Sequence, residues 1–269
     1  MISLVLSCVN PPDSAFRSIA SALRYMPSGS EVVVHVDPSE THSLQQFKSL
    51  QTKGLSLLIS NERVGFAEGL NLAVGQARHE LIARLDVDDY SYPWRWSYQM
   101  SRMRSVDFHF GGLAHKITKL FPSLPGYPVR LETEEFAIVS LFRNPGFHPA
   151  AMFRKSVFLE LGGYRPAIAE DYDFWLRALT NGYEFERGTL PVTRYARHPG
   201  QATSQIGWAE RVEMDPYIIE SKAALKTKLS EAGVETSMVL RRLLKGQPLA
   251  KIEFRDIVYK ESQQRHGEE

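Results

Sequence analysis

The 269-residue chain has a single cysteine, Cys8, and no hydrophobic run long enough to span a bilayer. A single cysteine forms no intramolecular disulfide and provides no cysteine-based zinc site, and it is in keeping with a reducing compartment. The opening segment MISLVLSCVNPPD has no basic residue before its short apolar run, so we expect no secretory signal peptide. These absences favour a soluble, cytoplasmic protein.

Charge of one sign is not in excess either. The chain has 32 Lys and Arg residues and 31 Asp and Glu residues, which gives a formal net charge of +1. Because nucleic-acid-binding domains usually carry a strong basic excess, this balance argues against a nucleic-acid partner. The composition, 43% hydrophobic and 23% charged, is that of a globular protein. The length accommodates one large domain, or one domain with an appendage.

The first half of the chain alternates short apolar runs with helix-like stretches. We expect strands at 2–9, 31–37, 55–60 and 80–86, and helices at 13–25, 41–53 and 67–77. Near-continuously apolar strands separated by helices are typical of βαβ units. They predict an α/β fold with a parallel sheet that helices cover on both faces.

The second half is less regular. A helix is expected from Pro93 to Arg104, then a strand at VDFHFGG, while prolines and a glycine make 115–135 irregular. PAAMFRKSVFLELGGY indicates a strand, a helix and a glycine stop, and AEDYDFWLRAL begins a further helix. From Trp208 the chain is helix-like and more basic. We therefore expect an α/β domain over 1–204 and a C-terminal helical extension over 205–269.

Three carboxylates crowd together in ARLDVDDYSYP, at Asp86, Asp88 and Asp89. Two such charges about 4 Å apart repel by roughly 4 kcal/mol at an effective dielectric constant of about 20, so water or a cation has to separate them. Ligands of open α/β sheets bind beyond the carboxyl ends of the strands, and these residues follow the fourth expected strand. Carboxylate oxygens suit Mg²⁺ or Mn²⁺. A solvated acidic turn is the alternative, because Asp is common in turns.

Polar or glycine-rich turns recur at the ends of the other three expected strands. Ser7 is near the end of the first strand and Asp37 ends the second, while Gly65 and Asn71 flank the start of the helix after the third. The N-terminus of a helix offers backbone N–H groups to an anion. Each turn alone is ordinary. Together they predict a pocket for a nucleotide diphosphate with its metal.

A second acidic cluster, Glu170, Asp171 and Asp173, lies in AEDYDFW. Crowding raises the proton affinity of one carboxylate in such a group, which suits a general base. Helix capping is the alternative, because the helix dipole favours acidic residues in the first turn.

The segment NERVGFAEGLNLAVGQARHELIARLDVDDYSYPWR, followed by GGYRPAIAEDYDFWLRAL, resembles the family 2 glycosyltransferases of the GT-A fold. The resemblance covers roughly residues 3–204. It implies a Rossmann-like, mostly parallel sheet, with a nucleotide-sugar-binding half at 1–105 and an acceptor or catalytic half at 106–204. The activity it implies is inverting transfer of a hexosyl or N-acetylhexosaminyl group, with Mn²⁺ or Mg²⁺. A UDP-sugar would be the donor, and a hydroxyl of a glycan or lipid-linked acceptor would receive the sugar.

The resemblance also assigns roles to single residues. It implies that Asp171 is the catalytic base and that Asp86 and Asp88 hold the metal, with Asp88 as the direct ligand. The positions it implies for donor binding are Ser7, Asp37, Gly65, Asn71, Asp86 and His198. The chain departs from the family at Pro38, where many members have glycine in Asp-Asp-Gly-Ser, and proline removes an N–H from that turn. The roles of Asp89 and His148 are left open.

Two rival functions use similar parts. A nucleotidyltransferase that forms sugar nucleotides would usually carry a glycine-rich loop with a basic residue after the first strand, where this chain has SCVNPPDSAF. A non-catalytic nucleotide- or sugar-binding module needs no base, so the presence of both acidic clusters argues against it. The Gln-x-x-Arg-Trp motif and the membrane helices of processive synthases are also absent, which predicts a non-processive enzyme.

The segment VLRRLLKG is the clearest amphipathic stretch of the C-terminal extension. A basic amphipathic helix can lie on an anionic membrane, which would place the protein peripherally at the inner face of the membrane. The alternative is a packed helix or a dimer contact, and we favour this alternative over the membrane.

Overall fold

The computed structural model describes residues 1–8, 14–37, 54–115, 124–125, 129–196, 201 and 205–246. The expected helix at 41–53, the expected donor residue His198 and the end of the C-terminal extension lie outside these residues.

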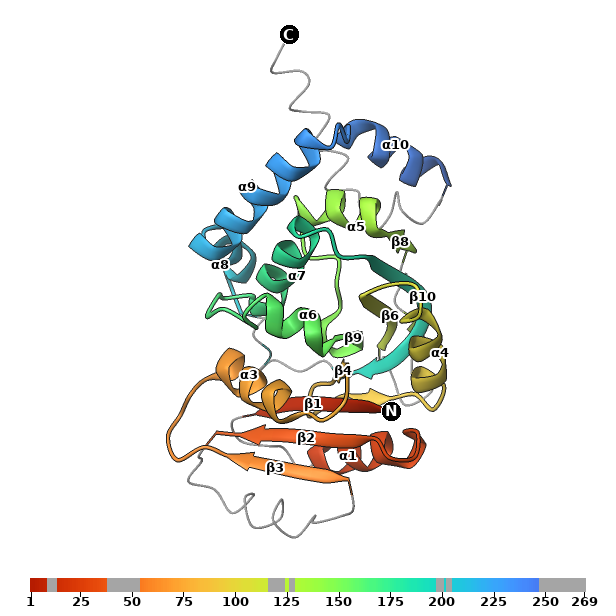
Figure 1. Cartoon of the computed structure of the whole chain (residues 1–269), viewed down its shortest axis with the longest axis vertical. Coiled ribbons are helices and arrows are strands. Elements are labelled where there is room, and N and C mark those ends of the chain that lie inside the picture. The colour runs from red at the N-terminus through yellow and green to blue at the C-terminus, as the bar shows by residue number, and fades with distance from the viewer. Residues whose placement is uncertain are drawn as a thin grey trace.

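One mixed sheet forms the centre of the molecule (Figure 1), with the strand order β3-β2-β1-β4-β9-β6-β10-β5. Listed in chain order, these strands are β1 (Ile2–Cys8), β2 (Glu31–Val36), β3 (Leu55–Ile59), β4 (Leu81–Arg84), β5 (Tyr90–Ser91), β6 (Phe108–His115), β9 (Ala151–Arg154) and β10 (Phe185–Tyr195). Two short strands are added, with β7 (Leu124–Pro125) paired to β6 and β8 (Leu131–Glu132) paired to β10. Strands β1 to β4 run parallel, as expected, whereas β9 is antiparallel to both β4 and β6.

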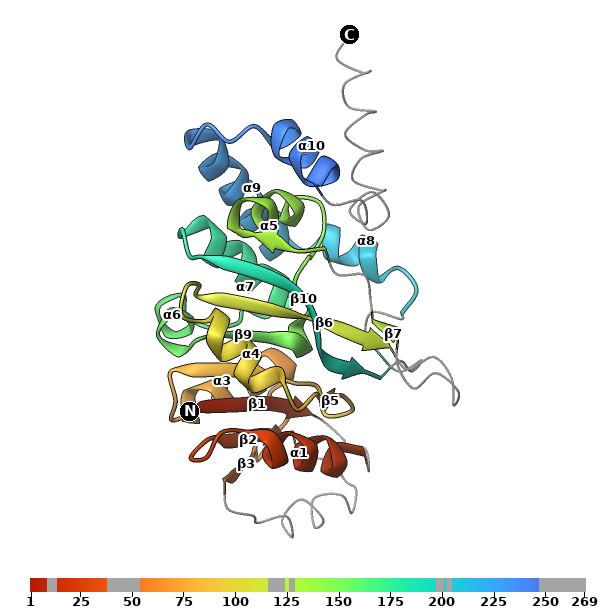
Figure 2. The ribbon, with the colours of Figure 1, turned by 90° about the vertical axis from the view of Figure 1, so that its right-hand side faces the viewer.

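Helices cover both faces of this sheet (Figures 1 and 2). One face carries α1 (Ser14–Tyr25) and α4 (Arg95–Arg102), and the other carries α3 (Phe66–Gln76), α6 (Lys155–Glu160) and α7 (Glu170–Thr180). Residues that alternate along β1 enter two different cores: Leu4 and Leu6 pack with α1, and Val5 packs with α3. Because both faces are buried, these strands are apolar almost throughout, which is the pattern that predicted them.

The remaining helices lie beyond α7, at the end of the molecule opposite β3 (Figure 1). They are α5 (Thr133–Ser140), α8 (Trp208–Glu213), α9 (Pro216–Glu231) and α10 (Thr236–Gly246). The apolar residues of VLRRLLKG, namely Val239, Leu240 and Leu243, are buried in the same core as α7. This contact is the one that the packing interpretation predicts. None of the helices in the described residues has the length and apolarity needed to cross a bilayer.

Helix α5 and strand β10 were not expected from the sequence, and neither were the two-residue strands β5, β7 and β8. Helix α5 begins inside the segment that we expected to be irregular, and β10 was missed because Gly188 and Pro191 interrupt its pattern. The pairing of β10 with β6 shifts register between Arg187 and Pro191, so the strand accommodates the proline at an irregularity. A Cβ at Gly188 would collide with the Tyr98 hydroxyl oxygen, so a larger residue there would require Tyr98 to move.

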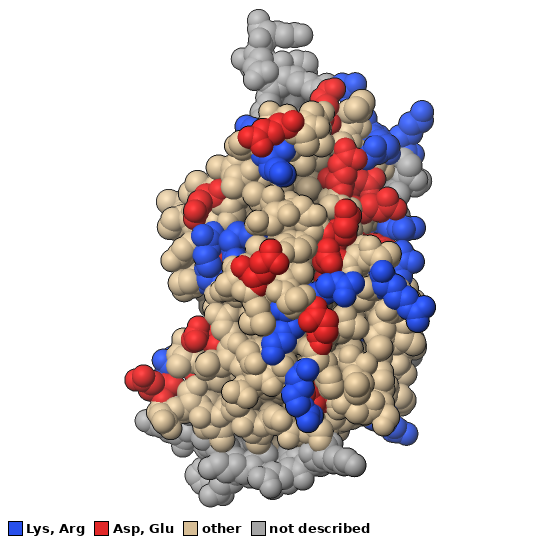
Figure 3. Space-filling model, in the orientation of Figure 1, with Lys and Arg blue, Asp and Glu red and all other residues tan. Residues whose placement is uncertain are grey.

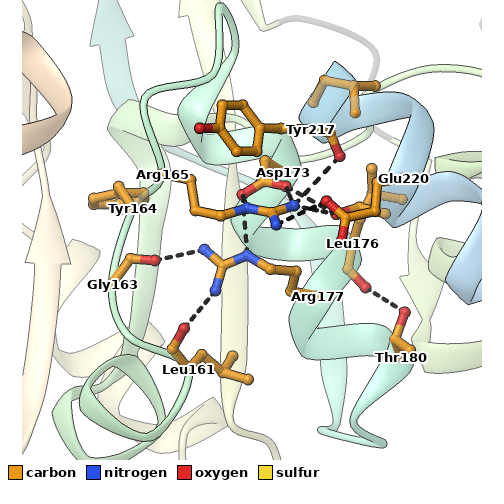
Figure 4. Close-up of polar contacts among 12 residues, drawn as sticks. Leu161, Gly163, Tyr164, Arg165, Asp173, Leu176, Arg177, Thr180, Tyr217 and Glu220 are labelled. Atoms are coloured by element: carbon orange, nitrogen blue, oxygen red, sulfur yellow. Dashed lines mark hydrogen bonds and ion pairs between the residues drawn. The ribbon is translucent and has the colours of Figure 1, made fainter. Parts of the chain in front are cut away.

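A buried carboxylate joins α7 to its neighbours (Figure 4). Asp173 is fully buried, and it accepts hydrogen bonds from Arg165 at 2.6 and 3.0 Å and from Arg177 at 3.0 Å. It also accepts one from Ser221 of α9 at 2.8 Å. Arg177 donates in addition to the carbonyl of Leu161. The pair of arginines therefore fixes the turn before α7, and Ser221 fixes the C-terminal extension.

The charged side chains at the surface are of mixed sign. Figure 3 shows Lys and Arg interspersed with Asp and Glu over the displayed face.

A histidine on β6 is buried beside a glutamine amide. His109 is fully buried, and its Nδ1 lies 3.1 Å from Gln99 Nε2, which can only donate. Burial, assisted by the charges of Arg102 and Arg95, lowers the pKa of His109 to about 3. The ring is therefore neutral in the folded protein.

We predict that acid destabilises the protein through His109. Its pKa is about 6.5 in the unfolded chain, so its contribution is complete above that pH and is lost as the pH falls toward 3, by about 2 kcal/mol between pH 7 and pH 5. His109→Asn keeps an acceptor for Gln99 but cannot titrate. In urea unfolding, the variant should be less stable than wild type at pH 7, yet lose about 2 kcal/mol less on acidification. Equal losses in the two proteins would contradict this prediction.

Candidate functional site

The carboxyl ends of β1 and β4 open into a pocket with a volume of about 1590 Å³. Strands β2 and β3 lie on one side of β1 and β4 lies on the other, so the pocket is at the switch point where open α/β sheets bind ligands. Residues that the sequence predicted for the site line this pocket: Ser7, Gly65, Asn71, Asp86, Asp88 and Asp171. Asp37 is not among the described residues of the lining.

Asp86 and Asp88 both lie on the turn after β4. The side chain of Asp86 is 33% exposed, and one of its oxygens lies 2.6 Å from the Nη2 of Arg84. Arg84 is fully buried beneath the pocket, and it also donates to the carbonyl of Leu85. The guanidinium fixes the orientation of Asp86. Two carboxylates on one turn at the pocket are a donor set that fits Mg²⁺ or Mn²⁺.

Asp89 points the other way, into the protein. It is fully buried, accepts a hydrogen bond from the Ala196 N–H at 2.8 Å, and its main-chain carbonyl accepts one from Ser18. Burial, followed by the charge of Asp86, raises the pKa of Asp89 to about 9. The third acid of the cluster therefore attaches the turn to the end of β10 and to α1.

Asp37 holds the loop that leads into α3. It is 1% exposed, and its two carboxylate oxygens accept hydrogen bonds from the N–H groups of Val64 and Gly65 at 3.0 and 3.1 Å. Gly65 has a φ of 89°, which favours glycine, and it immediately precedes the helix. The contact of Asp37 with a nucleotide base stays a prediction, and the structure adds this role in shaping the loop.

Asn71 joins α3 to the segment before α7. Its Oδ1 accepts from the Tyr164 N–H at 2.8 Å, and its Nδ2 donates to the Tyr164 carbonyl at 3.0 Å. Gly163 allows this close approach, because a Cβ there would lie 2.7 Å from the Asn71 oxygen. Asn71 borders the pocket, but its amide is paired with the protein's own backbone.

Asp171 lies at the start of α7 on the opposite side of the pocket from β1. Its Oδ2 accepts a hydrogen bond from Asn144 Nδ2 at 3.0 Å, and burial raises its pKa to about 6. Burial and the neighbouring Asp171 raise the pKa of Glu170 to about 8. A carboxylate that combines raised proton affinity with a place in the pocket lining can act as a general base.

His148 completes this side of the site. Its Nε2 lies 3.0 Å from the Tyr164 hydroxyl, and its Nδ1 lies 3.5 Å from a Glu170 oxygen. Burial lowers the pKa of His148 well below its ordinary value. The sequence left the role of His148 open, and the structure places it beside the acidic pair.

Sequence reasoning missed several residues that shape the site. Arg84 precedes the acidic turn and could have been singled out from the sequence, because a charged residue in an otherwise apolar strand has to be paired. No sequence pattern pointed to Asn144 or Tyr164, because their contacts join segments that are far apart in the chain.

Known proteins resemble this chain in sequence and in fold. The family model described as glycosyl transferase family 2 matches residues 3–162. The chain is 26% identical over 238 residues to the amylovoran biosynthesis glycosyltransferase AmsE of Erwinia amylovora, which covers 84% of this chain and 87% of the relative. It is 24% identical over 216 residues to the Escherichia coli UDP-Glc:alpha-D-GlcNAc-diphosphoundecaprenol beta-1,3-glucosyltransferase WfaP, which covers 76% of this chain and 80% of that relative.

Among solved structures, S. aureus TarS 1-349 in complex with UDP-GlcNAc superimposes with a TM-score of 0.65 at 16% identity, covering 90% of this chain and 70% of that one. This likeness confirms the expected fold. The family match spans more than half of the chain and includes the acidic turn after β4, although it ends before Asp171. The chain belongs to glycosyl transferase family 2.

Proposed function

We propose that the protein transfers a sugar from a UDP-sugar to a hydroxyl of a lipid-linked glycan, with inversion and one sugar per encounter. The observation that carries the proposal is one pocket bordered by both acidic groups, Asp86 and Asp88 from the turn after β4 and Asp171 from α7. The donor is supported by the UDP-GlcNAc complex of TarS, and the acceptor by the diphosphoundecaprenol substrate in the name of WfaP.

In the proposed reaction Asp171 removes the proton from the acceptor hydroxyl while that oxygen bonds to the anomeric carbon. The bond between the anomeric carbon and the donor diphosphate breaks at the same time, and its electron pair leaves with the diphosphate. Attack from the face opposite the leaving group inverts the configuration. Asn144 holds the Asp171 carboxylate in position by donating to Oδ2. A hydroxyl is a weak nucleophile, so a positioned base is needed.

Asp88 and Asp86 are the residues that we propose to hold Mg²⁺ or Mn²⁺. When bound, the cation offsets the negative charge that develops on the departing diphosphate. The ligand atoms of His148, Glu170 and Asp171 also lie within 4.8 Å of one another, as a second group able to hold a cation. We favour the first pair because Asp86 is 33% exposed while Glu170 is 14% exposed, and because Asn144 already donates to Asp171.

Removal of the Asp88 carboxylate should abolish the effect of metal on donor binding. In calorimetric titration with UDP, we expect wild type to bind more tightly in the presence of Mn²⁺ and Asp88→Ala to show the same affinity with and without it. Glu231→Ala, which removes an exposed acid at the end of α9, is the matched control and should behave like wild type. A Mn²⁺ effect that persists in Asp88→Ala would remove that residue from the metal site.

We predict that Asp171→Asn lowers the rate of sugar transfer without changing the affinity for UDP. An Asn keeps an oxygen for Asn144 but accepts no proton from the acceptor, so the transfer rate should fall by roughly 10²–10⁴. UDP affinity, measured by the same titration, should stay close to that of wild type. A variant that transfers sugar at the wild-type rate would show that Asp171 is not the base.

A further inference from the structure

Two acids stand side by side at the start of α7. Glu170 and Asp171 are neighbours in its first turn, both line the pocket, and one oxygen of each lies within 4.8 Å of the other. The Glu170 side chain is 14% exposed. Because two carboxylate charges repel strongly where little water separates them, the pair has to take up a proton or a cation. The mechanism proposed above uses Asp171 and gives Glu170 no part.

Glu170 differs from the other buried acid of α7 in what surrounds it. Asp173, on the same helix, is fully buried and forms ion pairs with Arg165 and Arg177. In the part of the chain that the structure describes, no lysine or arginine nitrogen lies within 4.0 Å of the Glu170 carboxylate. The group that faces it is His148, whose Nδ1 lies 3.5 Å from Oε1. Burial without a cationic partner favours the neutral form of a carboxyl group.

Asp171 has a partner that favours its charged form. Asn144 donates from Nδ2 to Asp171 Oδ2 at 3.0 Å, and Asn144 Oδ1 accepts from the N–H of Gly146 at 3.0 Å. The second contact fixes the amide with its NH₂ group toward Asp171, and a donor stabilises an ionised carboxylate. The pKa values follow the same order, about 6 for Asp171 and about 8 for Glu170. Glu170 is therefore the member of the pair that holds a proton at pH 7.

His148 presents a neutral ring to this neutral acid. The imidazole lies edge-on to Tyr164 and Trp175, with ring centroids 5.5 and 5.9 Å away, so packing fixes its orientation. Burial lowers the pKa of His148 well below its ordinary value, which leaves the ring with one N–H. When Nδ1 faces the hydrogen of Glu170, that N–H belongs on Nε2, which lies 3.0 Å from the Tyr164 hydroxyl and donates to its oxygen.

We propose that Glu170 works as a neutral acid whose hydrogen faces His148, and that these two positioning residues leave Asp171 as the member of the pair that takes the acceptor proton. The consequence for Asp171 rests on the proposed function. An ionised Glu170 would raise the proton affinity of Asp171 further, and a base that is already protonated accepts nothing from the acceptor hydroxyl. A neutral Glu170 keeps Asp171 available at pH 7.

Charges on other elements act on Glu170 in both directions. Burial is the largest influence on its pKa, and the charges of Asp171 and of Asp86, on the turn after β4, raise the pKa further. Arg84 of β4 acts the other way. His148 and the hydroxyl behind it are uncharged. The balance of these groups keeps the Glu170 carboxyl neutral below about pH 8 and ionises it above.

Infrared spectroscopy tests the protonation of Glu170 without reference to activity, because the C=O stretch of a protonated carboxyl is separate from the bands of a carboxylate. In the difference between wild type and Glu170→Gln, we expect a protonated-carboxyl band at pH 7 that is lost above about pH 8. Glu231→Gln, at an exposed acid, is the matched control and should give no such band. The contribution of the buried Asp89 cancels in the difference. Absence of the Glu170 band at pH 7 would overturn the inference.

The same measurement with Mn²⁺ separates a proton from a cation at this place. A cation bound between the acids would displace the hydrogen of Glu170. The band should therefore persist when Mn²⁺ is added at pH 7. Its loss on addition of Mn²⁺ would overturn the inference in favour of a cation site at Glu170 and Asp171.

The change from carboxyl to amide should also distinguish the two acids kinetically. Glu170→Gln keeps a neutral group of the same shape, so the transfer rate should stay within about threefold of wild type. The fall of kcat/KM below about pH 6, which reports the base Asp171, should remain in this variant. A loss in Glu170→Gln comparable with that expected for Asp171→Asn would show that the Glu170 carboxylate takes part in the reaction, and the inference would fail.

His148→Phe tests the part played by the histidine. The variant keeps an aromatic ring against Tyr164 and Trp175 but removes Nδ1, so the hydrogen of Glu170 loses the acceptor that faces it. The C=O band of Glu170 should then move to higher frequency. An unchanged band would refute the positioning role of His148, and Glu170→Gln decides the outcome for Glu170 if His148→Phe does not fold.

Failure of the proposed function gives a different result. Wild-type protein that transfers no sugar from any UDP-sugar would overturn the proposed function, while a band from protonated Glu170 would still support the neutral acid. Wild-type protein that transfers sugar but lacks the band would overturn the inference alone.

Discussion

The buried carboxylate of Asp173 is the constraint on which the site depends. A charge with no access to water has to be neutralised and hydrogen-bonded, and breaking such an arrangement costs about 3–5 kcal/mol because an uncompensated charge is left inside. Arg165 and Arg177 supply the charge, and Ser221 supplies a further donor. Asp171 lies two residues earlier on the same helix, so the position of the proposed base follows from this ion cluster. The turn held by the arginines continues to Tyr164, whose backbone pairs with α3, and the geometry of the donor side is thereby linked to that of the base.

The acidic residues at the strand ends divide into two groups that look alike in the sequence. Asp86, Asp88 and Asp171 border the pocket, whereas Asp37 and Asp89 are buried and hold loops through backbone N–H groups. A buried carboxylate that accepts from the backbone determines where the neighbouring loop runs, and an exposed one is available to a ligand. The site therefore needs both kinds. The two groups differ in whether the carboxylate faces the pocket or the protein interior, and the sequence DVDD alone does not show which way each side chain points.

Much of the fold could be predicted because the relevant signals are local. The apolar strands, the alternation with helices and the acidic turn after β4 are all readable within short windows, and together they predicted the sheet and the pocket at its edge. The pairings of Asn71 with Tyr164 and of Asn144 with Asp171 were not readable, because they join residues 93 and 27 positions apart. Strand β10 was hidden for another reason, since its glycine and proline are tolerated only because the register with β6 shifts beside them.

Strand β9 has a consequence for how the molecule can move. It hydrogen-bonds to β4 on one side and to β6 on the other, so the strands that carry the proposed donor side and those of the second half form one uninterrupted sheet. A hinge between the halves would have to break a ladder of buried backbone hydrogen bonds, and each group left unpaired costs about 1–3 kcal/mol. Entry of substrates and exit of products must then occur without separation of these strands. The continuous sheet thereby limits changes in the separation between the turn that carries Asp86 and Asp88 and the helix that carries the proposed base.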